Sequence, residues 1–85
     1  MYKIKISKDA VKFLAKVKKD DRERIMKRIH ELAENPRNEN VIKLVNSIPE
    51  TYRARQGDYR ILFTIHDKEL IVEVIDIKNR QDAYR

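Results

Sequence analysis

Three arginines stand close together in the second half of the chain, at Arg53, Arg55 and Arg60. Around them, residues 43–85 contain five arginines against three lysines. A guanidinium group is planar and donates paired hydrogen bonds that match the oxygens of a phosphate, whereas a surface lysine mostly contributes solvation. Arginines at this spacing therefore indicate a site that binds an anion.

The spacing also places these arginines on neighbouring strands. Gly57-Asp58 has the composition of a two-residue turn between a strand at residues 52–56 and another at 59–66. Such a turn sets Arg55 directly opposite Arg60, with Arg53 on the same face. The other face is apolar and carries Tyr52, Ala54, Ile61, Phe63 and Ile65. Like charges that face each other destabilise a sheet by about 0.2–1 kcal/mol. Two interpretations stay open: the side chains extend into water, or a bound phosphate relieves the repulsion.

The elements before this hairpin are a strand and two helices. Residues 2–7 alternate apolar and polar side chains, which is typical of a half-buried strand. Ser7 is the expected N-cap of a first helix that ends near Lys19, because apolar residues follow at spacings of three and four. A second helix is expected from Asp20, the first residue of a capping box, to the residue before Pro36.

The rest of the chain is predicted to be β-structure. Residues 36–49 contain a short extended segment, and a strand at residues 69–77 follows a second two-residue turn, Asp67-Lys68. The apolar faces of the helices need a sheet to cover. The sequence therefore predicts an α+β fold in a single small domain, residues 1–85. Its order is an N-terminal strand, a helical hairpin and then an antiparallel sheet, β-α-α-β-β-β.

The composition excludes several classes of protein. The chain has 85 residues, 41% hydrophobic and 40% charged, which is typical of one folded domain rather than a disordered segment. Without cysteine or a long apolar run, we expect a cytoplasmic protein with no membrane segment. The net charge of +6 predicts an anionic partner, with nucleic acid ahead of an acidic protein.

Two other groups of side chains are candidates for binding. His30 and His66 have no acidic or histidine partner at the spacing of metal ligands, so we predict no metal and no other cofactor. A run of basic residues follows the helical hairpin, and it is either a solvated face or a contact for a nucleic-acid backbone. The run comprises Lys16, Lys18, Lys19, Arg22, Arg24, Lys27 and Arg28.

Longer stretches of the sequence resemble a known family. The motif Tyr-Arg-Ala-Arg-Gln-Gly-Asp-Tyr-Arg at residues 52–60 is followed by Ile-Asp-Ile-Lys-Asn-Arg at residues 75–80 and by Tyr84. Together with Lys43-Leu44, these residues are similar to the RelE branch of the RelE/ParE toxin superfamily. The resemblance spans nearly the whole chain, and these toxins share the order of elements predicted above.

The resemblance implies the toxin of a toxin–antitoxin system that cleaves messenger RNA in the ribosomal A site, by attack of the 2′-OH on the phosphate. A cognate RelB-like antitoxin, the ribosome and messenger RNA would be its partners. By position, Arg60 matches the arginine that holds the scissile phosphate, and Arg80 the arginine linked to leaving-group or charge stabilisation. Tyr84 matches the tyrosine near the cleaved nucleotide. Arg53 and Arg55 stand where the best-known member has lysines, one of them its proposed general base. Because a guanidinium group stays protonated, we expect Arg55 to stabilise a 2′ oxyanion.

A set of basic residues is predicted to contact RNA: Arg53, Arg55, Lys78, Arg85, Lys18, Lys19 and Arg22. Two other functions stay open. Members of the ParE branch share the fold but inhibit DNA gyrase by protein contact and carry no nuclease site. Alternatively, the chain is a catalytically weak relic of a toxin that only binds an antitoxin or nucleic acid.

Overall fold

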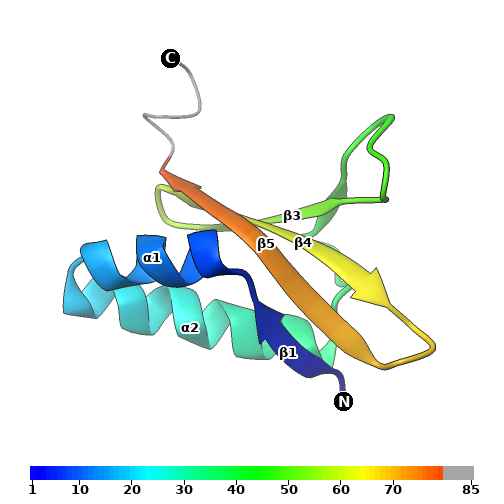
Figure 1. Ribbon diagram of the computed structural model, residues 1–85, viewed down its shortest axis with the longest axis horizontal. Helices are drawn as coiled ribbons and strands as arrows, with labels where there is room; N and C mark the ends of the chain where they lie inside the picture. The colour runs from blue at the N-terminus through cyan, green and yellow to red at the C-terminus, as the bar shows by residue number, and fades with distance from the viewer. Residues whose placement is uncertain (80–85) are drawn as a thin grey trace.

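The computed structural model describes residues 1–79, which form a sheet with two helices packed on one of its faces (Figure 1). The elements are β1 (Lys3–Ile6), α1 (Lys8–Lys16), α2 (Lys19–Glu34), β2 (Ile42–Lys43), β3 (Tyr52–Gln56), β4 (Tyr59–His66) and β5 (Ile71–Asn79). The five strands lie in the order β1-β5-β4-β3-β2. β1 runs parallel to β5 and all other neighbours are antiparallel, so the predicted α+β fold is confirmed.

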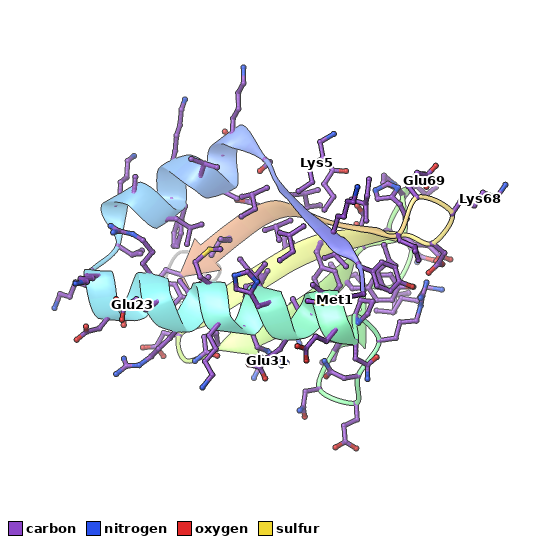
Figure 2. All side chains as sticks on the ribbon, turned by 90° about the horizontal axis from the view of Figure 1, so that it is seen from below. Met1, Lys5, Glu23, Glu31, Lys68 and Glu69 are labelled. Atoms are coloured by element: carbon purple, nitrogen blue, oxygen red, sulfur yellow. The ribbon has the colours of Figure 1, made fainter. Side chains whose placement is uncertain are left out.

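The core lies between the helices and the inner face of the sheet. Ile25, Ile29 and Leu32 of α2 are fully buried in one cluster with Ile61 and Phe63 of β4. Each such side chain contributes about 1.5–3 kcal/mol by leaving water. Figure 2 shows α2 lying across the sheet, with Glu31 on the side of the helix turned away from α1. No helix within residues 1–79 is long and apolar enough to span a membrane.

The connection between the helices is held by Arg22. α1 ends at Lys16, three residues earlier than predicted. The Nε–H of Arg22 donates to the Leu14 carbonyl at 2.7 Å, and its Nη2 donates to the Val17 carbonyl at 3.1 Å. These bonds satisfy carbonyl groups that the end of a helix leaves without partners.

The start of α2 differs from the prediction. Lys18 occupies the N-cap position and makes no side-chain capping bond, so the expected capping box at Asp20 is wrong. Asp20 and Asp21 lie inside the first turn instead. Their carboxylates there interact favourably with the positive end of the helix dipole, which explains why acidic residues begin this helix without capping it.

The two hairpins of the sheet have turns of different length. β3 and β4 pair in the predicted register, with Arg55 opposite Arg60 across the turn at Gly57. Between β4 and β5, the predicted two-residue turn is wrong, because four residues from Asp67 to Leu70 separate the strands. Leu70 adopts a left-handed conformation with φ of 54° to close this turn. The expected short extended segment is β2, which pairs with the start of β3.

β5 contains a bulge at Ile75. Leu62 of β4 pairs with Asp76, whereas the next residue, Phe63, pairs with Val74, so Ile75 is an extra residue on β5. The Ser7 hydroxyl donates to the Ile75 carbonyl at 2.8 Å and also caps α1 as predicted. Because side chains alternate along a strand, the extra residue exchanges the faces of everything that follows it.

A polar clasp closes the other end of the sheet. Both oxygens of the Asp67 carboxylate accept from Arg37, at 2.9 and 2.8 Å, and one also accepts the Tyr2 hydroxyl at 2.7 Å. The hydrogen bonds from Arg37 and Tyr2 lower the pKa of Asp67 from 3.8 to about 2. The same bonds raise the pKa of both donors. The clasp joins the residue before β1, the segment after α2 and the β4–β5 turn.

Candidate functional site

Within residues 1–79, four cations lie on the outer face of β3, β4 and β5, away from the helices. Arg55, Arg60 and Lys78 pair directly across β3, β4 and β5 and form one row. Arg53 lies one row further along, opposite Leu62. We call these four residues the arginine face.

The alternation of the strands explains why the arginine face forms. Ala54 and Ile61 alternate with the arginines and are fully buried in the core. Arg55 and Lys78 are exposed, while Arg60 is half-buried. Directly paired Cβ atoms lie about 4.5–5.5 Å apart, so the row spans about 10 Å. Three cations at this spacing repel one another, and a bound anion would relieve that repulsion.

The bulge adds a carboxylate to this surface. Ile77 is buried opposite Ile61, so its neighbour Asp76 faces outward, beside Leu62. Asp76 therefore lies diagonal to Arg60 and two positions from Lys78 on the same strand. Its Oδ1 accepts the N–H of Ile77 at 2.9 Å, which orients the carboxylate.

Sequence reasoning missed this residue. If β5 had no extra residue after Val74, Asp76 would pair with the core residue Ile61, and its side chain would face the core. The signal that could have shown the bulge is the spacing of apolar residues in β5, where Val72, Val74 and Ile77 are separated first by two positions and then by three.

A hollow of about 540 Å³ adjoins the arginine face at the edge of β3. β2 pairs only with the first two residues of β3, and beyond that point the hollow opens toward α2. Its lining includes Arg28, Glu31, Asn40, Ile42, Arg53 and Arg55. Arg53 and Arg55 thus belong both to the arginine face and to the hollow. The contributions from α2 come from positions more than 20 residues away in sequence, and no local pattern pointed to them.

Other predicted residues lie elsewhere. Lys18 and Lys19 are exposed at the start of α2, in the helical layer behind the sheet, and the structure does not bring them to the arginine face. Arg22 was predicted to contact RNA, but its guanidinium is engaged by carbonyls at the end of α1. Its position is explained by helix capping.

Three predicted residues, Arg80, Tyr84 and Arg85, lie outside residues 1–79. Within the described part of the chain, no group of three acidic or histidine side chains is placed to hold a metal ion. Tyr59 packs against α1, where its ring meets the ring of Phe13 edge-on with centroids 5.8 Å apart.

The fold and the arginine face define a small basic α+β protein whose exposed sheet surface suits an anionic ligand. A family model described as the ParE toxin of the type II toxin–antitoxin system parDE matches residues 4–84. The chain belongs to this toxin family, within the RelE/ParE superfamily that its motifs resemble. No curated protein sequence matches the chain.

Solved structures of RelE toxins have the same fold. A chain of the archaeal RelE–RelB complex from Pyrococcus horikoshii OT3 has 32% identity and a TM-score of 0.80, covering 93% of this chain and 94% of that chain. The isolated E. coli RelE toxin has 25% identity and a TM-score of 0.77, covering 93% of this chain and 84% of its own. The RelBE2 toxin–antitoxin complex from Mycobacterium tuberculosis, at 22% identity, covers 93% of this chain and 98% of its own and shares the fold with a TM-score of 0.83. The protein is therefore a RelE-like toxin of a type II toxin–antitoxin system.

Proposed function

We propose that the protein is a ribosome-dependent endoribonuclease that cleaves messenger RNA in the A site and thereby inhibits translation. The observation that carries this proposal is the row of Arg55, Arg60 and Lys78 beside the carboxylate of Asp76. Cleavage of RNA by its own 2′-OH needs charge stabilisation at phosphorus, removal of the hydroxyl proton and a proton for the leaving oxygen. The arginine face supports the first of these directly.

In this mechanism Arg60, at the centre of the row, holds the scissile phosphate. Arg55 lies directly opposite and stabilises negative charge that develops on the 2′ oxygen. The diagonal neighbour Asp76 accepts the proton of the 2′-OH. The 2′ oxygen then bonds to phosphorus, the bond to the 5′ oxygen breaks, and a 2′,3′-cyclic phosphate remains.

The leaving oxygen requires a proton from elsewhere. By the family resemblance, Arg80 would stabilise charge at this oxygen, and Tyr84, the substrate or a ribosomal group would supply the proton. His66 is not placed to do so, because it lies at the far end of β4 from Arg60 and pairs with Glu73 at 3.3 Å. The ribosome would align the RNA, and orientation alone can remove a large part of such a barrier. We therefore expect slow cleavage of free RNA.

The proposal includes a cognate antitoxin of the RelB type as partner. Several of the similar structures are toxin–antitoxin complexes. The arginine face would bind acidic side chains of such a partner, and an antitoxin that covers Arg55 and Arg60 would block the RNA at the same time. An antitoxin bound only on the helical layer, without altering the segment that carries Arg80 and Tyr84, would contradict this.

The test is primer extension on messenger RNA engaged by ribosomes, with wild-type protein, Arg60→Ala and Lys68→Ala. Lys68 lies in the β4–β5 turn, at the opposite end of the sheet from Arg60 (Figure 1), so its variant removes one positive charge away from the arginine face. We expect cuts within the A-site codon that disappear in Arg60→Ala and persist in Lys68→Ala. Cuts of equal strength in both variants would refute the role of the arginine face.

A second candidate function is inhibition of DNA gyrase, which the match to the ParE toxin family favours. The same protein would then slow supercoiling of relaxed plasmid by gyrase. Inhibition of supercoiling together with unaffected translation would replace the nuclease proposal with this one.

A further inference from the structure

The hollow between α2 and the edge of β3 has the features of a ligand site. Its volume of about 540 Å³ lies within the range of pockets that hold small organic ligands, about 300–1,000 Å³. Three arginines and one carboxylate line it, together with the amides of Asn40 and Gln56. This combination suits a ligand that carries both a negative charge and hydrogen-bonding edges.

Arg28 gives a second, independent observation. Its Nε–H is buried and has no hydrogen-bond acceptor within the described part of the chain. Buried donors in folded proteins nearly always have an acceptor, so this N–H is available to an acceptor that enters the hollow. A phosphate oxygen is an acceptor that a guanidinium donor binds strongly.

The hollow is continuous with the arginine face, because Arg53 and Arg55 line both. We propose that the hollow binds the RNA nucleotide adjoining the scissile phosphate, an inference that rests on the proposed function. Arg28 and Arg53 contact its phosphate, and the half-exposed side chain of Ile42 contacts the flat face of its base.

Glu31 then contributes selectivity. Its carboxylate projects from the side of α2 turned away from α1 (Figure 2) and accepts hydrogen bonds only. A carboxylate binds the exocyclic amino group of cytosine and repels a carbonyl oxygen at the same position. The site therefore prefers cytosine to uracil at this nucleotide.

The test is binding of fluorescently labelled RNA trinucleotides that differ only by cytosine or uracil at one position, measured by anisotropy with the isolated protein. Arg28→Ala should weaken both trinucleotides by about 10-fold, since one charge-assisted hydrogen bond is lost. Glu31→Gln should bind at similar strength but lose the preference for cytosine. Lys27→Ala is the matched control, because this neighbouring cation lies outside the lining of the hollow and should bind like wild type.

The results separate this inference from the proposed function. If wild-type protein cleaves on the ribosome but Arg28→Ala binds as tightly as Lys27→Ala, the hollow is not a nucleotide site and the nuclease proposal stands. If binding depends on Arg28 but no ribosomal cleavage occurs, the hollow is a nucleotide site with no scissile phosphate beside it, and the nuclease proposal fails. Tight binding of an acidic peptide that depends on Arg28, with no RNA binding, would assign the hollow to a protein partner and overturn the inference.

Discussion

Replacing Arg55 by glutamine should make the protein more stable while making it a weaker nuclease. Arg55 is exposed and lies directly opposite Arg60, which is followed in the same row by Lys78. Like charges directly opposite each other on antiparallel strands cost about 0.2–1 kcal/mol. Glutamine keeps the length and polarity of the side chain but removes one of the three repelling charges.

The size of the effect follows from the length of the chain. For a domain of 60–100 residues, 1 kcal/mol shifts the melting temperature by about 4–8 °C, so Arg55→Gln should melt about 1–8 °C above wild type. The charges are at the surface, where the screening length falls from about 30 Å at 0.01 M salt to about 3 Å at 1 M. The difference should therefore be largest at low salt and nearly vanish at 1 M.

Thermal unfolding followed by circular dichroism at both salt concentrations measures this. Lys3→Gln is the control, because Lys3 is an exposed strand cation whose partner on β5 is the uncharged Ile71. Its melting temperature should change little. If Arg55→Gln melts at or below the wild-type temperature in low salt, the row of cations does not destabilise the sheet. If the gain in melting temperature persists at 1 M salt, it does not come from repulsion between these charges.

Three further outcomes are expected. Asp76→Asn should lower ribosome-coupled cleavage by about 10²–10⁴-fold, the usual contribution of a general base, with unchanged melting; equal cleavage rates in single-turnover assays would exclude Asp76 as proton acceptor. Because the pKa of Asp67 is lowered from 3.8 to about 2, its contribution to stability is present above about pH 4 and is lost as the pH falls through 2. Asp67→Asn should accordingly unfold at lower urea concentration at pH 7, and its urea midpoint should change less than that of wild type between pH 4 and pH 2. Phe63→Ala removes a fully buried ring and should cost about 3–5 kcal/mol in chemical denaturation, whereas a loss below 1 kcal/mol would mean that this part of the core is not tightly packed.

Local signals in the sequence predicted the hairpin that carries the arginines. Gly57-Asp58 favours a tight turn, and a two-residue turn fixes the register of both strands, so the pairing of Arg55 with Arg60 followed directly. The second turn was predicted wrongly because Leu70, a residue that rarely adopts a left-handed conformation, does so here. Nothing in its residue type indicated the longer loop.

Other features depend on tertiary contacts, which no local pattern in the sequence predicts. The carbonyls at the end of α1 are satisfied by Arg22 from the first turns of α2, which no capping pattern in the sequence indicates. The hollow brings Arg28 together with Arg55, from elements that share no local pattern. Asp76 reaches the outer face only because Ile75 is bulged. The arginines of the site were thus predictable, and the residues that surround them required the packing of the whole chain.

The bulge at Ile75 also affects how this chain should be compared with its relatives. In a homologue that lacks the extra residue, the positions aligned with residues 76–79 face the opposite side of the sheet, even where the amino acids are identical. A gap of one position placed before or after Ile75 therefore decides whether a surface residue is matched with a core residue. At this end of β5, a functional role should be transferred between homologues only where the two residues have the same position in the strand pairing. Sequence identity alone does not show which face of the sheet a residue occupies.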